Sequence, residues 1–433
     1  MELKVVFKFF VIFFGVLAFS QNLDYALIKK GVQDDNTMLL IGGIQGDEPG
    51  GFLAASIVAT DYNITKGSLW VVPNLNFPSI IQRSRGTKGD MNRKFAKIDK
   101  DDPDYRAVIS IKKLITDPRV SLILNLHDGS GFYSGKYVSN DINPSRWGST
   151  CIVDQKILHG SSYPKLEDIA TRVKDHINSK ILDSHHTYHV KNTRTAEGDV
   201  EMLKSLTYYA VTQNKSAFAN EASKNLNAEE RTYYHLLAIE EYMRVVGIEF
   251  TRPFELDVKS VKKAIEKEIH LSFFNNMFVL NLIDTRSALT YIPLKMGVEP
   301  EYVSTNPLLA VIKEGNGYKV QYGNRFVTKL IPQYFQYGKK IDTIKVIVDG
   351  KEEILQSGTK VSVENFFNIE KQNGIRVNVI GYNSGKIDES DENISRKNMI
   401  TRYSTDKAGK IYRVELYEIN SNKFVGMFLV EFV

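Results

Sequence analysis

The feature that most constrains the fold is an uninterrupted apolar run, Val-Ser-Leu-Ile-Leu-Asn-Leu, at residues 120–126. Such a run is typical of a central strand in a sheet that helices cover on both faces, where parallel strands occur. Two further buried strands are predicted at 38–41 and 69–72. Helices are predicted at 52–59, 105–114, 166–181 and 229–246. This alternation predicts an α/β fold with a mostly parallel sheet up to about residue 250.

The sequence changes character after Thr251-Arg252-Pro253. One lysine-rich helix is predicted at 258–269, and short strands follow, the first at 278–282. A strand at 344–348 then meets Asp349-Gly350, a dipeptide typical of a type I′ hairpin turn. Further alternating strands, predicted at 377–379, 412–416 and 424–433, favour a small immunoglobulin-like β-sandwich.

The N-terminus has the pattern of a secretory signal peptide. Lys4 and Lys8 precede an apolar run at 9–19, and Ala18-Phe19-Ser20 is a small-x-small cleavage signal. An uncleaved N-terminal anchor is the alternative, although the run is short for a membrane span of ~20 residues. We therefore expect an exported, periplasmic protein. Whether this segment is cleaved stays open.

Length and composition bound the remaining possibilities. A chain of 433 residues exceeds the roughly 250–300 residues that one core supports, so several domains are expected. The 56 Lys and Arg against 51 Asp and Glu give a net charge of +5 without a basic block, which argues against a nucleic-acid partner. The single cysteine, Cys151, excludes an intramolecular disulfide and is expected to be a small buried residue.

These signals predict four segments. Residues 1–20 are the signal peptide, 21–251 the α/β domain, 252–340 a β-rich middle domain and 341–433 the immunoglobulin-like β-sandwich. The predicted fold class is thus α/β, a mixed sheet flanked by helices, followed by two smaller β-rich domains.

Chemically versatile side chains follow the predicted strands. Gln45 and Glu48 come after the first strand, His127 ends the central strand, and Glu221 follows a later apolar segment. Open α/β sheets bind their ligands at the carboxyl ends of the strands. We therefore expect these four side chains to converge on one site in the α/β domain.

The order of these residues resembles that of the zinc carboxypeptidases of the pancreatic type, whose pattern is His-x-x-Glu, Arg, Asn-Arg, His and a general-base Glu. Arg85 and Asn92-Arg93 stand in the intermediate places. Asp-Met-Asn-Arg at 90–93, followed by Lys94-Phe95, is also similar to the aspartoacylase-like deacylases of that superfamily. The first ligand is Gln45 where the pattern has His. This departure, the signal peptide and the β-rich domains resemble the cell-shape-determining peptidoglycan DL-carboxypeptidases of helical Gram-negative bacteria.

The resemblance implies a metal site with one Zn²⁺ per chain, held by Gln45, Glu48 and His127. Zinc hydrolases use three protein ligands and a water. Gln45 offers only an uncharged carbonyl oxygen, so we expect weaker metal binding than in a His₂Glu site but a stronger Lewis acid. Glu221 is then the general base, and zinc with Arg85 stabilises the tetrahedral oxyanion.

The resemblance also implies a substrate pocket. Asn92 and Arg93 are expected to hold the terminal carboxylate, since a guanidinium fork suits that group. Arg85 can take this role instead, and the division of labour between Arg85 and Arg93 stays open. Trp147 and Thr207 are candidates for the pocket wall. Tyr208, beside Thr207, is a further candidate for the cleft, and for Trp147, Thr207 and Tyr208 a purely structural role is at least as well supported.

The function implied is the trimming of peptidoglycan tripeptide stems to dipeptides by release of diaminopimelate, which influences cell shape. The β-rich domains are then candidates for contacts with cell-shape proteins. Two alternatives stay open. One is an aspartoacylase-like amidohydrolase acting on small N-acyl amino acids, and the other is a non-catalytic wall-binding scaffold with a relic metal site.

His185, His186 and His189 form a rival candidate for a metal cluster. Their spacing faces one way only on a helix. The neighbours Thr187, Tyr188 and Val190 favour a strand, which would spread the three rings apart. We expect this cluster not to be the native metal site.

Overall fold

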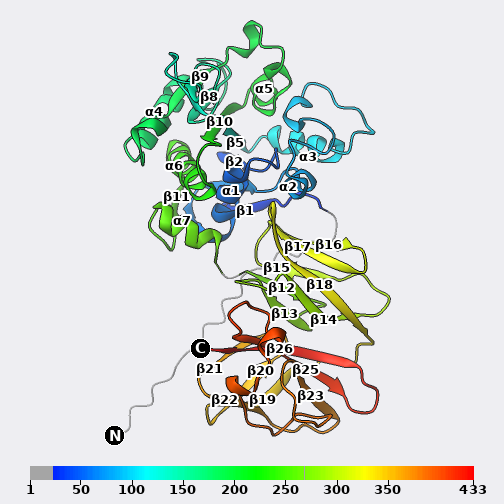
Figure 1. The fold of residues 1–433 in the computed structure, drawn as a ribbon. Coiled ribbons are helices and arrows are strands. Elements are labelled where there is room, and N and C mark those ends of the chain that lie inside the picture. The colour runs from blue at the N-terminus through cyan, green and yellow to red at the C-terminus, as the bar shows by residue number, and fades with distance from the viewer. Residues whose placement is uncertain (1–22, 268) are drawn as a thin grey trace. The chain divides into compact units, whose positions relative to one another are not determined.

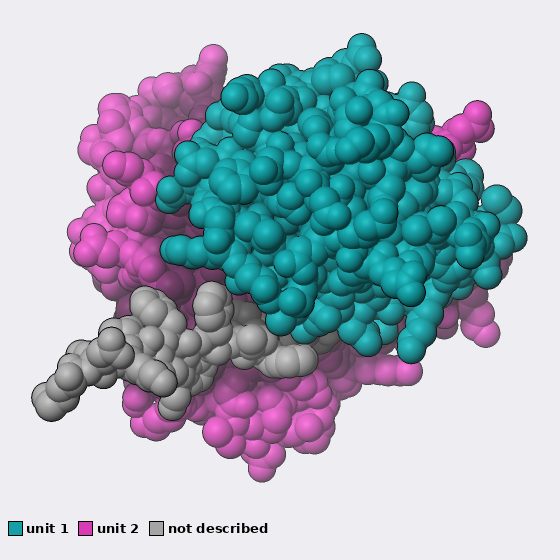
Figure 2. All heavy atoms as spheres, turned by 90° about the horizontal axis from the view of Figure 1, so that it is seen from below, with its two compact units in different colours: residues 1–21, 269–305, 331–433 teal, residues 22–268, 306–330 magenta. Residues whose placement is uncertain are grey.

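The computed structural model describes residues 23–267 and 269–433, so the predicted signal peptide at 1–20 lies outside the described residues. The chain divides into two compact units (Figure 2). The unit called here the α/β unit comprises residues 22–268 and 306–330, and the β unit comprises 269–305 and 331–433. The predicted middle domain, 252–340, is thus shared between two units, and the three domain boundaries given by the sequence stay a prediction.

A seven-stranded mixed sheet forms the centre of the α/β unit (Figure 1). Its strands, in spatial order, are β1 (Ile28–Gly31), β4 (Ser68–Val72), β2 (Thr37–Ile41), β5 (Val120–Gly129), β10 (Ser216–Ser223), β8 (Thr150–Val153) and β9 (His189–Asn192). The four strands from β4 to β10 run parallel, β1 is antiparallel to β4, and β8 is antiparallel to β10. The predicted α/β class with a mostly parallel sheet is confirmed.

Helices cover both faces of this sheet. They are α1 (Pro49–Asp61), α2 (Phe77–Gln82), α3 (Tyr105–Ile115), α4 (Leu166–Asn178), α5 (Leu206–Thr212), α6 (Ala228–Val246) and α7 (Val258–Ile265). Leu39, Ile41 and Ile123 of the sheet pack in one cluster with α3 and α5. Helix α1 packs on α6 and on β5, outside that cluster. Every residue of β5 is buried as a result, as its apolar run predicts.

Local signals fix the ends of the helices. Helix α6 begins with a capping box, in which the Asn227 side chain accepts from the Glu230 amide and the Glu230 carboxylate accepts from the Asn227 amide. It ends at Gly247, whose φ of +81° is a left-handed conformation that glycine adopts without strain. None of the helices in residues 23–267 and 269–433 is long and apolar enough to cross a membrane.

Helix α7 belongs to the α/β unit, beyond the boundary expected at residue 251. Its buried side chains, Val261 and Ile265, lie where α7 packs on α6. Lys267, just after the helix, forms an ion pair with Asp61 at 2.7 Å. The helix is shorter than the predicted 258–269. Short strands β3 (Asn63–Lys66) with β11 (Glu249–Thr251), and β6 (Phe132–Tyr133) with β7 (Ile142–Asn143), complete the regular elements before residue 268.

Segment 306–330 joins the α/β unit although it is distant in sequence. It contains β16 (Leu309–Glu314) and β17 (Gly317–Tyr322) and the start of β18 (Arg325–Phe335). The buried Asn306 side chain accepts from the Ser56 hydroxyl at 3.0 Å. The Arg83 guanidinium donates to the Asn324 carbonyl at 2.7 Å. These contacts between distant segments have no signal in the local sequence pattern.

The β unit contains only strands and short turns of helix. A three-stranded antiparallel sheet has the order β13 (Phe278–Asn281), β12 (His270–Phe273) and β15 (Tyr302–Ser304). The long strand β14 (Ala288–Lys295) also lies in this unit.

Two four-stranded sheets form the C-terminal part of the β unit. One has the order β20 (Lys351–Gln356), β19 (Thr343–Val348), β22 (Phe366–Ile369) and β24 (Ile394–Ser395). The other has the order β21 (Lys360–Val363), β26 (Phe424–Phe432), β25 (Ile411–Glu418) and β23 (Ile375–Val379). Asp349 and Gly350 have φ values of +51° and +83°, as the predicted type I′ turn requires. One apolar cluster draws residues from both sheets, which confirms a sandwich.

The position of α7 gives a first prediction. Ile265 is 3% exposed, so its replacement by alanine should lower the free energy of unfolding of the α/β unit by about 2–5 kcal/mol. Both tryptophans of the chain, Trp70 and Trp147, lie in this unit, so urea unfolding followed by tryptophan fluorescence reports on it alone. Lys263→Ala, at an exposed position of the same helix, is the control. An unchanged fluorescence transition in Ile265→Ala would instead support the boundary at residue 251.

Candidate active site

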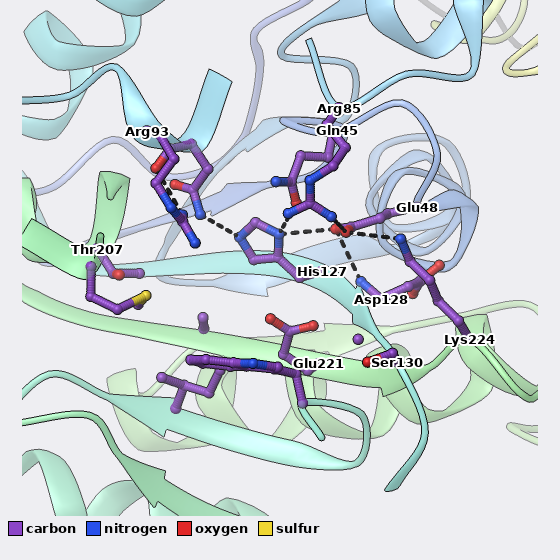
Figure 3. A pocket seen from close by; sticks show the side chains of 16 residues that line it. Gln45, Glu48, Arg85, Arg93, His127, Asp128, Ser130, Thr207, Glu221 and Lys224 are labelled. Atoms are coloured by element: carbon purple, nitrogen blue, oxygen red, sulfur yellow. Dashed lines mark hydrogen bonds and ion pairs between the residues drawn. The ribbon is translucent and has the colours of Figure 1, made fainter. Parts of the chain in front are cut away.

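The pairing of β5 with β10 positions the centre of the site. Strand β5 continues past the predicted end at Leu126 to Gly129, so His127 lies within the strand. The parallel β10 pairs with it in a register that places Glu221 directly opposite His127. Paired residues of neighbouring strands point to the same face of a sheet. In Figure 3 the Glu221 carboxylate accordingly lies close to the His127 ring.

Gln45 and Glu48 reach His127 from the loop that leads into α1. His127 Nδ1 lies 2.9 Å from Gln45 Oε1 and 3.0 Å from Glu48 Oε2. All three side chains are buried. Glu48 is the residue before Pro49, which opens the helix. The structure thus brings together the three residues that the sequence nominates as metal ligands.

Asp90 determines which end of the Gln45 amide faces His127. Gln45 Nε2 donates to Asp90 Oδ1 at 2.7 Å, which leaves Gln45 Oε1 directed at His127 Nδ1. The other oxygen, Asp90 Oδ2, accepts from Arg85 at 3.0 Å and 3.2 Å. The effect of Arg85 and Gln45 outweighs burial and lowers the pKa of Asp90 below its ordinary value. Sequence reasoning did not assign a role to Asp90, although it opens the Asp-Met-Asn-Arg motif.

The hydrogen bond made by the second ring nitrogen of His127 decides whether Nδ1 is free of a proton and able to bind a metal. Its Nε2 lies 2.8 Å from Asn125 Nδ2, while Asn125 Oδ1 is buried and accepts no hydrogen bond from the described residues. Rotating the Asn125 amide by 180° would let His127 Nε2–H donate to that oxygen. His127 Nδ1 would then be unprotonated and able to bind a metal. With a carboxylate, an imidazole and an amide oxygen converging, the donor set fits a divalent metal ion.

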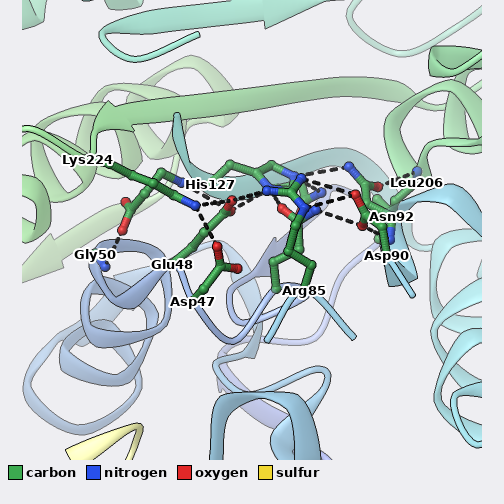
Figure 4. A network of polar contacts seen from close by, with 12 residues as sticks. Asp47, Glu48, Gly50, Arg85, Asp90, Asn92, His127, Leu206 and Lys224 are labelled. Carbon is green, nitrogen blue, oxygen red and sulfur yellow. Dashed lines mark hydrogen bonds and ion pairs between the residues drawn. The ribbon is translucent and has the colours of Figure 1, made fainter. Parts of the chain in front are cut away.

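Cations and a backbone amide surround the Glu48 carboxylate (Figure 4). Arg85 Nη1 and Lys224 Nζ each lie 3.3 Å from Glu48 Oε1. The Asp128 amide donates to Glu48 Oε2 at 3.1 Å. Lys224 also forms an ion pair with Asp47 at 2.7 Å. These contacts compensate for the burial of the Glu48 carboxylate beside His127.

The surroundings of Glu221 favour proton transfer. Burial raises the pKa of Glu221 to about 7, and Glu48 and Asp128 act in the same direction, against His127 and Lys224. A carboxylate with a pKa near the working pH can both accept and return a proton. Asp128 itself is buried and satisfied by Arg231, His235 and the Gly50 amide, so it orders the end of β5.

The pocket around these groups contains all the predicted substrate-binding residues. They are Arg85, Asn92, Arg93, Trp147 and Thr207. Tyr208, the further candidate beside Thr207, does not line the pocket. Figure 3 shows Arg93 and Thr207 on one side of His127, and Lys224 and Ser130 on the other.

Two of these residues have donors directed toward the pocket. Asn92 Oδ1 accepts from the Leu206 amide at 2.9 Å, so its Nδ2 faces His127 at 3.4 Å. Arg93 Nη1 donates to the Asn92 carbonyl, and its Nε lies 3.6 Å from the exposed Glu201. Arg85, in contrast, is held by Glu48 and Asp90. Arg93 therefore has more freedom than Arg85 to bind a substrate carboxylate.

Sequence reasoning missed several lining residues. They are Asp128, Gly129, Ser130, Ile152, Met202, Ala219 and Lys224. Lys224 follows Glu221 by only three residues. A lone lysine has no specific signal in a sequence, however, so its place in the pocket could not be predicted. The predicted residue Trp147 has one face of its ring covered by Lys191, whose Nζ lies 3.7 Å from the ring centroid. Burial lowers the pKa of Lys191 to about 8.

The rival histidine cluster does not form. The predicted strand begins only at His189, because His185 and His186 lie in a 3₁₀ turn, Ser184–His186. His185 contacts Asp183, and His186 stacks on Phe132 with ring centroids 5.5 Å apart. No three residues among the described His, Cys, Asp and Glu side chains are arranged as metal ligands. Cys151 is buried in β8, as expected.

Comparison with known families and structures gives consistent matches. The family described as "Carboxypeptidase controlling helical cell shape catalytic" matches residues 6–266, and the "C-terminal domain of metallo-carboxypeptidase" matches residues 337–433. The product-bound structure of the cell shape determinant Csd4 from Helicobacter pylori is 39% identical, with a TM-score of 0.86, over 95% of this chain and 100% of that one. No match was found among curated proteins.

Two further structures of the same Helicobacter pylori protein are equally similar. The tripeptide-bound form is 39% identical with a TM-score of 0.86, over 95% of this chain and all of that chain. The mDAP-bound form, described as a D,L-carboxypeptidase, is 40% identical with a TM-score of 0.86, over 94% of this chain and all of that chain.

The contact between Asp90 and Gln45 gives a second prediction. Asp90→Ala should lower the affinity for divalent metal by about 10–100-fold, because the Gln45 amide is then free to rotate. Metal binding is measured by competition with a chromophoric chelator. Glu48→Ala, which removes the only charged donor, should abolish binding, and Glu249→Ala at an exposed site is the control for charge. Wild-type affinity in Asp90→Ala would show that Gln45 is not oriented by this residue.

Proposed function

Because the chain belongs to the family of carboxypeptidases that control helical cell shape, we propose that it is a zinc-dependent peptidoglycan DL-carboxypeptidase. It would trim tripeptide stems to dipeptides by releasing diaminopimelate. The observation that carries this proposal is the convergence of Gln45, Glu48 and His127 beside Glu221. Enzymes of this family are metallo-carboxypeptidases, so a metal ion is part of their chemistry.

Several observations support the identity of the metal and substrate. Zinc accepts carboxylate and imidazole ligands and tolerates an amide oxygen as third donor. The similar Csd4 structures include product-bound, tripeptide-bound and mDAP-bound forms. One is a variant in which a glutamine is replaced by histidine, 39% identical with a TM-score of 0.85.

The residues of the site have distinct chemical roles in this proposal. A zinc ion held by Gln45, Glu48 and His127 would acidify a bound water and polarise the scissile carbonyl. Glu221 accepts the proton of the attacking water and passes it to the leaving amine. Arg85, 3.3 Å from Glu48, can also donate to the developing oxyanion.

The two ends of the pocket suit the two ends of diaminopimelate. Arg93 and Asn92 hold the carboxylate next to the scissile bond through N–H donors. Diaminopimelate carries a second amine and carboxylate at its far end, so a pocket for it needs both charge types. Lys224 lines the pocket on the other side of His127 in Figure 3, and its ion pair with Asp47, which is not itself a lining residue, brings both charge types near that side. A small N-acyl amino acid, the substrate of the alternative aspartoacylase-like reading, lacks this second zwitterionic end.

The setting of the enzyme follows from its substrate. Action on peptidoglycan places the protein at the cell wall, and the N-terminal pattern supports export to the periplasm. The β-rich region after residue 268 can bind wall components or cell-shape proteins. A non-catalytic scaffold with a relic site is less well supported, because the predicted ligands are in contact and the predicted base lies opposite His127 in the strand register.

The role of Glu221 gives a third prediction. Glu221→Gln preserves the shape of the side chain but cannot accept a proton, so turnover should drop by about 100-fold or more while substrate still binds. Release of diaminopimelate from muramyl tripeptide is followed by mass spectrometry, and binding by calorimetry. Glu197→Gln, at an exposed site, is the matched control. Near-normal turnover in Glu221→Gln would assign the base to another group.

The carboxylate clamp gives a fourth prediction, which also tests the substrate. Arg93→Ala should raise KM more than it lowers kcat, because ground state and transition state lose the same contact. Arg93→Lys should recover only part of the loss, since lysine has no planar fork.

Zinc-loaded enzyme should cut the monomeric tripeptide and act poorly on tetrapeptides and crosslinked stems. If it leaves the tripeptide intact but removes D-alanine from longer stems, the proposed substrate is wrong even if the metal site is right.

A further inference from the structure

A second cleft lies wholly within the β unit. Parts of β14, β18, β23 and β25 and the turns near residues 381 and 402 form it. Its lining includes Arg376, Arg402, Tyr403, Glu415, Tyr417 and Asn422. The lining combines aromatic rings, amides and charged groups, which is the composition of a site for a polar ligand.

A buried carboxylate contributes to the lining. Glu415 is 2% exposed, and its Oε2 accepts from the Tyr417 hydroxyl at 2.6 Å. Its Oε1 lies 3.3 Å from Arg413 Nη1 but accepts no hydrogen bond from the described residues. Arg413 instead donates to the carbonyls of Thr290 and Tyr291, both at 2.9 Å. Glu415 Oε1 is thus closed off from solvent beside Arg413, and Glu415 contributes to the cleft by positioning Tyr417 in its wall.

Two arginines of the cleft have no carboxylate partner within the described part of the chain. The Arg376 guanidinium lies 4.3 Å from the Tyr417 ring centroid and donates to Asn422 Oδ1 at 2.5 Å. The Arg402 guanidinium lies 4.8 Å from the Tyr403 ring centroid and donates to the Tyr403 hydroxyl at 3.0 Å. The aromatic rings hold both cations in place while leaving further N–H donors for an anionic ligand.

The cleft continues into a neighbouring hollow. Arg376, Asn378 and Asn422 line both, and the second is also lined by Lys371, Ile387, Asp388 and Ile419. Ile387 and Ile419 are 84% and 48% exposed. The combined groove therefore offers cations along its length and apolar surface at its far end, which suits an extended ligand better than a single small ion.

We propose that this groove is a second, non-catalytic binding site for the peptidoglycan stem peptide. Arg376 and Arg402 would bind its carboxylates. The stem peptide carries several carboxylates along an extended chain, whereas a glycan strand without peptides carries only the lactyl carboxylate of each muramic acid. The identity of the ligand rests on the proposed function. A second contact with the wall would raise the local concentration of substrate at the catalytic pocket, which is the benefit of multivalent binding.

The test uses the full exported chain carrying Glu221→Gln, which binds muramyl tripeptide without turnover. Titration calorimetry with this ligand should show two sites per chain. Adding Arg376→Ala and Arg402→Ala should weaken one of them by about tenfold or more, since each loses a charge-assisted hydrogen bond. Arg396→Ala, an exposed arginine of the same unit outside the groove, is the matched control and should keep both sites.

Enzyme activity separates this site from the catalytic pocket. In chains with Glu221 intact, the two arginine substitutions should leave kcat and KM on soluble tripeptide unchanged and slow diaminopimelate release from intact sacculi. A single site in every variant, or equal binding of glycan strands without peptides, would overturn the proposal. Failure of the proposed function would appear separately, as tripeptide left uncut by the zinc-loaded wild-type enzyme.

Discussion

The parallel register between β5 and β10 is the constraint on which the site depends. It sets Glu221 opposite His127, so the proposed base and one of the proposed metal ligands share one face of the sheet. A slip of one residue would turn Glu221 to the other face. Burial of β5 on both sides, together with buried Ala217 and Phe218 in β10, fixes this register through core packing. The distance between the two reacting groups is therefore a property of the hydrophobic core.

In the proposed function, Asp90 links the orientation of the metal ligand Gln45 to substrate binding. One of its oxygens accepts from Gln45 and the other from Arg85. A histidine ring can be oriented by its second nitrogen, but glutamine is a flexible ligand whose amide must be prevented from turning its nitrogen toward the metal. A carboxylate at this position accepts from the amide nitrogen and so excludes the wrong orientation. The cost of using glutamine is thereby reduced without adding charge to the metal.

The sequence predicted the elements whose signals are local. Apolar runs predicted β2, β4 and β5, and the order of polar residues near the strand ends nominated Gln45, Glu48 and His127, which the structure brings into contact. Residues whose role depends on contacts between distant segments could not be found. Asp90 acts on a residue 45 positions away, and Asn125 matters only because its side-chain carbonyl accepts no hydrogen bond from the described residues. Helix α7 and segment 306–330 belong to the α/β unit for the same kind of reason. Tertiary contacts decide their place, and the local sequence pattern does not show such contacts.

The charge around Glu48 explains how a weakly donating site can still be reactive. In the proposed function, one carboxylate is the only anionic ligand of the metal. Arg85 and Lys224 both approach Glu48 Oε1, so they withdraw negative charge from that carboxylate as well. A metal held by an amide oxygen, an imidazole and a partly neutralised carboxylate keeps more of its own charge. Weaker binding of the metal and stronger activation of its bound water then have one cause. The pocket cations that recognise an anionic peptide also contribute to the reactivity of the metal.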